Sequence, residues 1–204
     1  INYSYKTSDS TKYLRHKPRG YANMGYIRAF LRHPITTGSV KPSSRYLIKK
    51  MLAPIEFSSA KTIIELGPGN GCITKELLKK MHPESKLISI EINPKFAKQL
   101  EKINNPQLEI LVADAASLPS LLAKRGLTPD YIVSGVPLGA MKKKDVLAIM
   151  SAIKESTTTG KFIQFQYTLR WHKVFNEYFD TSISYTPLNI PPAFVYTCST
   201  SSPI

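Results

Sequence analysis

The chain has 204 residues, of which 42% are hydrophobic, so it is long enough for one globular domain with a sizeable core. It holds 28 lysines and arginines against 14 aspartates and glutamates, and this net charge of +14 favours a polyanionic partner, either nucleic acid or an anionic membrane surface. No apolar run has the ~20 residues of a membrane span, and Cys72 and Cys198 lack the spacing of a zinc site or a disulfide framework. A spanning protein, a secreted disulfide scaffold and a metal site are therefore disfavoured, and we expect a cytoplasmic location.

The chain begins with a basic stretch. Residues 1–20 are polar and are predicted to form a poorly ordered arm. In residues 21–33, apolar side chains recur at helical spacing while Arg28 and Arg32 share another face, which predicts a short basic amphipathic helix. Such a helix lies on a membrane surface, closes as a lid or packs on its own domain, and its sequence leaves these alternatives open.

A second helix is predicted from a cap at Ser43 or Ser44 to about Ala53. Up to that residue Asp9 is the only acidic side chain, so most of the net positive charge of the chain lies in this amino-terminal part. We therefore divide the sequence into a basic arm with amphipathic helices (1–56) and a domain that carries the chemistry (57–204).

The stretch that follows predicts a ligand-binding turn. Residues 62–66 form a β-branched apolar run typical of a buried strand, and Gly67, Gly69 and Gly71 end it before an amphipathic run over 72–81. Glycines let the backbone approach a ligand closely, and the start of the following helix offers unpaired N–H groups. We expect a small ligand on this loop.

The loop also indicates which ligand it binds. A dinucleotide fingerprint would need a third glycine where Cys72 stands, and no Gly-Lys-Ser/Thr of a P-loop follows. Glu65 would repel a pyrophosphate and suits a ligand with a cationic amino group. The segment Glu65-Leu66-Gly67-Pro68-Gly69-Asn70-Gly71 resembles motif I of the class I S-adenosylmethionine (SAM) methyltransferases.

Strand and helix patterns alternate from Lys61 onward, as expected for a parallel α/β sheet. Further strands are predicted over 86–91, 108–112, 130–134 and 161–167, and helices over 94–103, 117–125 and 142–154. Residues 182–185 and 193–198 predict a closing hairpin.

Two more acids stand where these strands end. Glu91 closes the second strand, 20 residues after Gly71, where a carboxylate can accept both hydroxyl protons of a ribose. Asp114 closes the third strand and can accept a hydrogen bond from an adenine amino group. Each acid alone is also typical of a helix cap. Together with Glu65 they predict a SAM site.

The fourth strand runs into Ser134-Gly135-Val136-Pro137-Leu138, where class I methyltransferases place the methyl acceptor. Enzymes that methylate adenine N6 usually carry an aromatic residue here that stacks on a flipped base. Leucine at position 138 removes that stacking platform, which disfavours a nucleic-acid acceptor.

Across residues 27–198 the chain resembles the bacterial phospholipid N-methyltransferases. The segments that carry this resemblance, besides the loop 65–71, are Phe30-Leu31-Arg32-His33-Pro34, Thr37-Gly38-Ser39-Val40-Lys41-Pro42-Ser43-Ser44, Ile90-Glu91-Ile92-Asn93-Pro94, Ser134-Gly135-Val136-Pro137-Leu138, Phe162-Ile163-Gln164-Phe165-Gln166-Tyr167 and Asn189-Ile190-Pro191-Pro192-Ala193. The resemblance implies a doubly wound, seven-stranded, mostly parallel Rossmann-like sheet with an N-terminal helical extension.

The resemblance also implies methyl transfer from SAM to a phospholipid amine by a protein peripheral on an anionic membrane. It places SAM on Glu65, Gly67, Gly69, Gly71, Glu91, Ile92, Asp114, Ala115 and Ser134. The residues expected to act on the acceptor are Tyr26, Tyr46, Tyr167 and Ser134, because tyrosine faces attract methylated ammonium by cation–π contact. Lys41, Arg45 and Arg170 are candidates for binding the lipid phosphate.

Two other functions remain open from the sequence. The first is an RNA-binding protein on the same fold, either similar to the rRNA adenine dimethylases or a catalytically silent ribosome-associated descendant. The second is a methyltransferase for small soluble amines. The sequence does not determine the oligomeric state or the number of methyl transfers.

Overall fold

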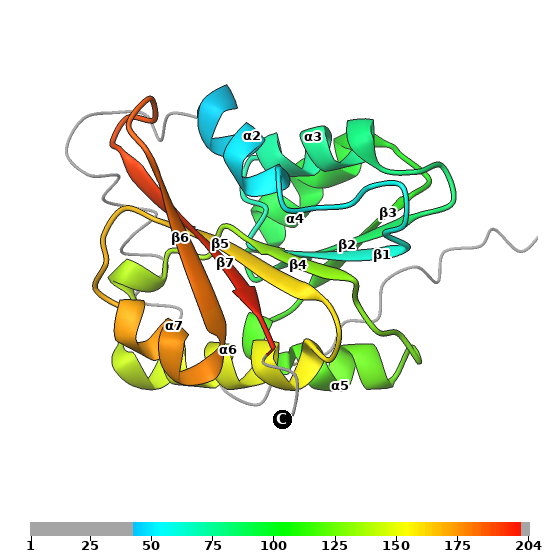
Figure 1. Cartoon of the computed structure of the whole chain (residues 1–204). Helices are drawn as coiled ribbons and strands as arrows, with labels where there is room; N and C mark the ends of the chain where they lie inside the picture. Colours follow the sequence, from blue (N-terminus) through cyan, green and yellow to red (C-terminus); the bar gives the residue numbers. More distant parts are fainter. Residues whose placement is uncertain (1–42, 201–204) are drawn as a thin grey trace, which may run out of the picture.

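A seven-stranded sheet forms the centre of the protein, as seen in the computed structural model, which describes residues 43–200 (Figure 1). The strand order is β3-β2-β1-β4-β5-β7-β6. The strands are β1 (Thr62–Leu66), β2 (Lys86–Glu91), β3 (Leu108–Val112), β4 (Tyr131–Ser134), β5 (Lys161–Gln166), β6 (Asp180–Thr186) and β7 (Ala193–Ser199). The first five are parallel, and β7 pairs antiparallel with both β5 and β6. This confirms the predicted doubly wound α/β architecture.

Helices cover both faces of this sheet. In Figure 1, α2 and α3 lie on one side, and α5, α6 and α7 lie on the other. The helices are α2 (Arg45–Leu52), α3 (Cys72–Lys80), α4 (Pro94–Leu100), α5 (Leu118–Ala123), α6 (Lys143–Ser156) and α7 (His172–Tyr178). Successive side chains of a strand point to opposite faces of the sheet. Ile63 of β1 therefore joins the apolar cluster under α2 and α3, while Ile64 joins the cluster under α5, α6 and α7. None of the helices within residues 43–200 is long and apolar enough to cross a membrane.

Helix α2 forms where the sequence predicts it. The Ser44 hydroxyl accepts a hydrogen bond from the Leu47 N–H at 3.2 Å and caps the first turn. Leu47 and Met51 are fully buried in the same cluster as Ile63 and Val195. The helix therefore shares its core with the sheet. The amphipathic helix predicted over 21–33 lies outside the described residues.

The structure differs from the sequence prediction at α7. No element was predicted over 172–178, where the structure has a helix of seven residues whose first turn has no side-chain cap. It is held by packing: Phe175 stacks on Tyr196 of β7 with ring centroids 4.3 Å apart, and on Phe162 of β5 at 6.0 Å. Elsewhere, the 3₁₀ turns Glu101–Ile103 and Ala115–Ser117 shorten the α-helices predicted over 94–103 and 117–125.

The predicted hairpin is confirmed as β6 and β7. Because β7 is antiparallel to both of its neighbours, β6 runs in the same direction as β5. Phe194 pairs with both Gln166 and Tyr185, so the ends of β5 and β6 are level. The hairpin turn at 187–192 therefore lies at the same edge of the sheet as the carboxyl ends of the parallel strands.

Candidate active site

The glycine loop between β1 and α3 forms the floor of the candidate site. Gly67, Gly69 and Gly71 have φ of 64°, 54° and 77°, in the left-handed region that favours glycine. A Cβ at Gly71 would also lie 2.8 Å from Leu100 Cδ2, so a larger residue there would require the Leu100 side chain to shift. The loop crosses close to the end of β4, where a Cβ at Gly135 would lie 2.9 Å from the Gly67 carbonyl oxygen.

Glu65 lies directly beneath this loop and is only 1% exposed. Its Oε2 accepts hydrogen bonds from Thr74 Oγ1 at 2.8 Å and from Ser89 Oγ at 2.7 Å. Burial raises the pKa of this carboxyl to about 7, against the opposing effect of those two hydroxyls. Its Oε1 is buried and has no hydrogen-bond partner among residues 43–200. The site therefore contains an acid that can change charge near neutral pH.

Glu91 and Asp114 complete the row of acids at adjacent strand ends. Glu91 Oε2 accepts the Gly69 N–H at 3.2 Å and its Oε1 accepts the Asn93 N–H at 2.8 Å. Burial raises the pKa of Glu91, and these backbone donors oppose that rise. Asp114 is exposed and accepts the Ala116 N–H at 2.9 Å, beside the half-buried Ala115. Ile92, also half-buried, directly follows Glu91. The tertiary structure thus brings the three predicted acids to one edge.

The segment that ends β4 and follows it, residues 134–140, has two buried residues, Ser134 and Leu138. Ser134 is fully buried, and its hydroxyl accepts the Val136 N–H at 3.2 Å. The Val136 carbonyl accepts hydrogen bonds from the Leu138 N–H at 2.8 Å and from two side-chain amides, Gln164 Nε2 at 3.0 Å and Gln166 Nε2 at 3.2 Å. Two lone pairs are all that a carbonyl oxygen offers. This carbonyl is therefore saturated.

The remainder of that segment is fixed in the same way. Gln166 Oε1 accepts the Gly139 N–H at 3.1 Å, and the Trp171 indole donates to the Leu138 carbonyl at 2.8 Å. Leu138 has no exposed surface and belongs to the apolar cluster under α5, α6 and α7. Side chains of β5 and of the loop after it thus hold the segment from below.

Asn189 connects three of the segments that carry the resemblance to the phospholipid N-methyltransferases. Its Oδ1 accepts the Ser44 N–H at 3.0 Å, and its Nδ2 donates to the Pro191 carbonyl at 2.7 Å. Its side chain also hydrogen bonds to Tyr167, and burial, which outweighs that bond, raises the pKa of the Tyr167 phenol. The start of α2, the end of β5 and the hairpin turn therefore meet at one buried amide.

Of the other predicted acceptor residues, Tyr167 hydrogen bonds to Asn189, and Arg45 and Tyr46 directly follow Ser44. Tyr46 and Tyr167 are 42% and 39% exposed. The Arg45 guanidinium donates to the Tyr46 hydroxyl at 3.0 Å, and that of Arg170 lies 5.0 Å from the centre of the Trp171 ring. Tyr26 and Lys41 lie outside the described residues.

Sequence reasoning missed the roles of Gln164, Gln166, Trp171 and Asn189. A signal existed for the two glutamines, because two amides at period two on one face of an otherwise apolar strand are unusual. Thr74 and Ser89, which hold Glu65, gave no such signal.

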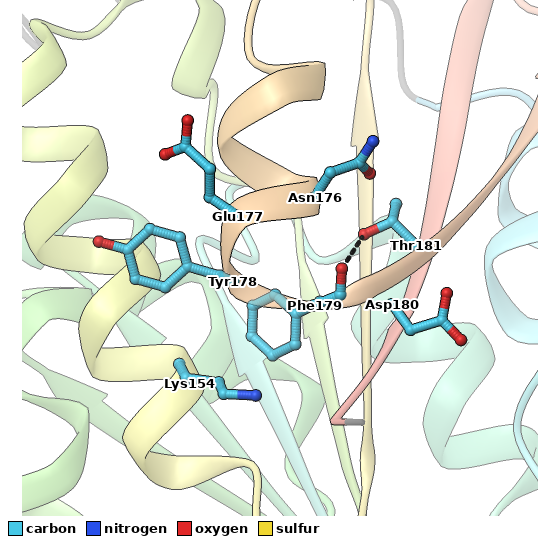
Figure 2. Close-up of a pocket in the computed structure, with 7 residues that line it drawn as sticks. All are labelled: Lys154, Asn176, Glu177, Tyr178, Phe179, Asp180 and Thr181. Carbon is cyan, nitrogen blue, oxygen red and sulfur yellow. Dashed lines mark hydrogen bonds between the residues drawn. The ribbon is translucent and has the colours of Figure 1, made fainter. Parts of the chain in front are cut away.

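A separate hollow of about 580 Å³ lies at the opposite edge of the sheet, where β6 begins. Figure 2 shows Lys154 from α6 facing Phe179, with the ammonium 5.3 Å from the ring centre, and the Thr181 hydroxyl donating to the Phe179 carbonyl. None of the predicted site residues that fall within 43–200 lines it. Within residues 43–200 no cluster of three side chains suited to a metal ion occurs.

The sheet order, the glycine turn after β1 and the acids at successive strand ends define a class I SAM-dependent methyltransferase. Solved structures share the fold. N-methyltransferase NodS from Bradyrhizobium japonicum in complex with S-adenosyl-L-homocysteine is 10% identical, with a TM-score of 0.66 over 87% of this chain and 99% of that one. A precorrin-6y C5,15-methyltransferase from Geobacter metallireducens is 16% identical, with a TM-score of 0.64 over 81% and 93%.

The chain belongs to the ribosomal RNA adenine dimethylase family, whose family model matches residues 43–169. Among individual relatives, an ornithine lipid N-methyltransferase from Singulisphaera acidiphila is 28% identical over 85% of this chain and 93% of that protein. A ribosomal RNA small subunit methyltransferase A from Mycoplasma capricolum is 33% identical, but over only 50% of this chain and 41% of its own length. SAM is therefore the methyl donor, as the sequence predicted.

The residues at the sheet edge fit this donor. The glycine turn leaves backbone space, since a Cβ at Gly69 would have no atom within 4 Å. The unpartnered Oε1 of Glu65 and the exposed carboxylate of Asp114 are acceptors for the cationic and amino groups that SAM carries.

Proposed function

We propose that this protein is an N-methyltransferase for the headgroup amine of a lipid such as phosphatidylethanolamine, acting at a membrane surface. The conformation of residues 134–140 carries the proposal. Leu138 is wholly buried, so no side chain at that position offers a face on which a flipped base could stack. The Val136 carbonyl already accepts hydrogen bonds from the Leu138 N–H and from two glutamine amides, so it is not free to accept an exocyclic amine.

The pattern of relatives supports a lipid as the acceptor. Similarity to the ornithine lipid N-methyltransferase extends over 93% of that protein, whereas the similarity to the ribosomal RNA small subunit methyltransferase covers 41% of that protein. The match thus covers nearly the whole length of the lipid enzyme.

We assign the donor site to the edge formed by β1, β2 and β3. SAM supplies a methyl group already activated on a sulfonium. Glu91 would accept the ribose hydroxyls and Asp114 the adenine amino group, with Ile92 and Ala115 flanking the ring and Glu65 balancing the positive charge. The loop Gly67–Gly71 lets the backbone approach, and Ser134 acts through its bond to Val136 rather than by touching substrate.

We assign the acceptor site to the junction around Asn189. An amine attacks only as the neutral base, so its proton must first leave to water or to a hydrogen-bond acceptor. Tyr167, held by Asn189, can orient the amine, and Tyr46 can face a methylated ammonium with an attraction of ~0.5 to 2 kcal/mol. Arg45 directly follows Ser44, which donates to Asn189, and Arg170 donates to the Gly139 carbonyl at 3.4 Å. Both guanidinium groups are candidates for binding the lipid phosphate. Tyr26 and Lys41 stay candidates for the same two tasks.

An RNA acceptor is the alternative, favoured by the family match over 43–169 and by the net charge of +14. Both hypotheses require SAM, so only the acceptor separates them. RNA binding would show a steep loss of affinity with salt.

The deciding experiment measures methyl transfer from labelled SAM to a total lipid extract, to total RNA and to free phosphoethanolamine. We expect label in the lipid fraction alone. Glu91→Gln should abolish transfer, while Glu76→Gln, which changes a half-buried acid of α3 paired with Lys79, should leave it unchanged. Label in RNA would overturn the proposal in favour of the dimethylase hypothesis, and label in phosphoethanolamine without lipid would favour a soluble amine.

A further inference from the structure

The turn of the β6–β7 hairpin exposes apolar side chains that the proposed chemistry does not use. Leu188 is 61% exposed and Ile190 is 75% exposed, the two highest values among large hydrophobic side chains of the described residues. Two exposed aliphatic side chains on one turn are costly, because contact between apolar surface and water is unfavourable. Their position calls for a partner that accepts aliphatic groups.

The turn is fixed in this conformation. Asn189, between the two, is 3% exposed and is tied to the Ser44 N–H and the Pro191 carbonyl. Because Asn189 is held inward, its neighbours Leu188 and Ile190 are directed to solvent. At the base of the turn, Tyr185 packs on Phe194 with ring centroids 5.2 Å apart. The apolar tip is thus presented on a rigid support.

The surroundings of the tip are positive. No acidic residue occurs in residues 43–55, 167–176 or 181–200. Helix α2 contributes Arg45, Lys49 and Lys50, and the Lys50 ammonium donates to the Tyr185 carbonyl at 2.9 Å, which joins the helix to the hairpin. Exposed tyrosines at 46, 167 and 185 lie on the same three segments. An aliphatic tip, a tyrosine belt and cations are the features that a protein presents to an anionic bilayer.

The tip also has a useful position relative to the methyl donor. The turn lies at the sheet edge that carries the glycine loop and residues 134–140, and Figure 1 shows the β6–β7 turn on the same side of the sheet as α2. A bilayer docked on the tip would bring headgroups to this edge while acyl chains remain in the membrane.

We propose that the β6–β7 turn, residues 187–192, inserts Leu188 and Ile190 into an anionic lipid bilayer and so orients the active-site edge toward the headgroups. This inference rests on the proposed lipid acceptor and names the surface that meets the membrane. A protein that docked only through the basic residues near its amino terminus would need no contact between this turn and acyl chains. Contact of the turn with acyl chains therefore distinguishes the two modes of docking.

The test places a fluorescent reporter on the turn of the full chain. Ile190→Trp is read against Ile183→Trp, an exposed position in the middle of β6, and the one native tryptophan, Trp171, is 7% exposed. With vesicles of phosphatidylglycerol and phosphatidylethanolamine, the Ile190→Trp variant should shift its emission to the blue and be quenched by brominated acyl chains. The Ile183→Trp variant should show neither change.

A second measurement uses affinity. The double variant Leu188→Ser, Ile190→Ser should bind the same vesicles roughly tenfold more weakly or worse, while Ile183→Ser binds as the wild type does. All of these side chains are exposed, so their replacement leaves the core intact.

Three results would overturn the docking proposal. Blue-shifted emission of the Ile190→Trp variant before vesicles are added would show that the tip is covered by another part of the chain or by a second copy. A shift with RNA and not with vesicles would indicate a nucleic-acid surface. Methylation of lipid with no quenching would refute docking but leave the proposed function standing, whereas quenching without methylation would support docking and refute the proposed acceptor.

Discussion

Glu65→Gln tests the electrostatics of the site. In the folded protein the pKa of Glu65 is about 7, above its ordinary value of 4.5, so between these two pH values the folded state holds a proton that the unfolded chain releases. The stability associated with this group is therefore full below about pH 4.5 and is lost as the pH rises through about 7. At 1.36 kcal/mol for each pH unit between the two values, the loss is of order 3 kcal/mol.

Glutamine resembles the protonated acid, so the variant should match the wild type near pH 4 and exceed its free energy of unfolding by about 3 kcal/mol near pH 8.5. Urea denaturation without ligand at a series of pH values measures this difference. The contributions of other titrating groups are the same in both proteins and cancel.

Glu109→Gln is the control of opposite sign. Burial raises the pKa of Glu109, but hydrogen bonds and charge from Lys86 and Arg125 outweigh it and lower the pKa overall. The stability from Glu109 is present at neutral pH and is lost on acidification, so this variant should be less stable at pH 7 and converge with the wild type in acid. A difference between Glu65→Gln and wild type that stays constant from pH 4.5 to 8.5 would refute the reasoning.

Three further variants test the loop, the carboxylates and the glutamines. Gly71→Ala should lower the free energy of unfolding by about 2 kcal/mol in urea denaturation, because alanine is disfavoured at a φ of 77° and its Cβ would meet Leu100; an unchanged midpoint would contradict this. Asp114→Asn keeps the cap on the Ala116 N–H, so calorimetry should show SAM affinity falling about tenfold with the melting temperature unchanged, and equal affinity would exclude Asp114 from the donor site. Gln166→Leu leaves the Gly139 N–H without its partner, so kcat should fall about tenfold while SAM affinity stays the same; a parallel loss of SAM affinity would instead indicate a wider structural effect.

The strands, the glycine turn and the acids Glu65, Glu91 and Asp114 followed from the sequence. Apolar runs of five or six residues and a glycine cluster are local signals, and parallel strands place their carboxyl ends at one edge whatever the details of packing. For the same reason the donor could be predicted from residues far apart in the chain.

The tertiary structure alone decided how residues 134–140 are held. Nothing local to Val136 indicates that its carbonyl is saturated by Gln164 and Gln166, and nothing in Leu138 indicates that it is buried. Helix α7 likewise depends on Phe175 meeting Phe162 and Tyr196 from other elements. Contacts of this kind form only when distant segments pack, so a pattern read along the chain does not contain them.

The same division holds for the acceptor side. The sequence determined the fold class and the methyl donor, because both depend on short-range periodicity and on the ends of strands. The tertiary structure decided which segments meet at Asn189 and where the tip at Leu188 and Ile190 is directed, because the antiparallel insertion of β7 between β5 and β6 carries that turn to the donor's edge.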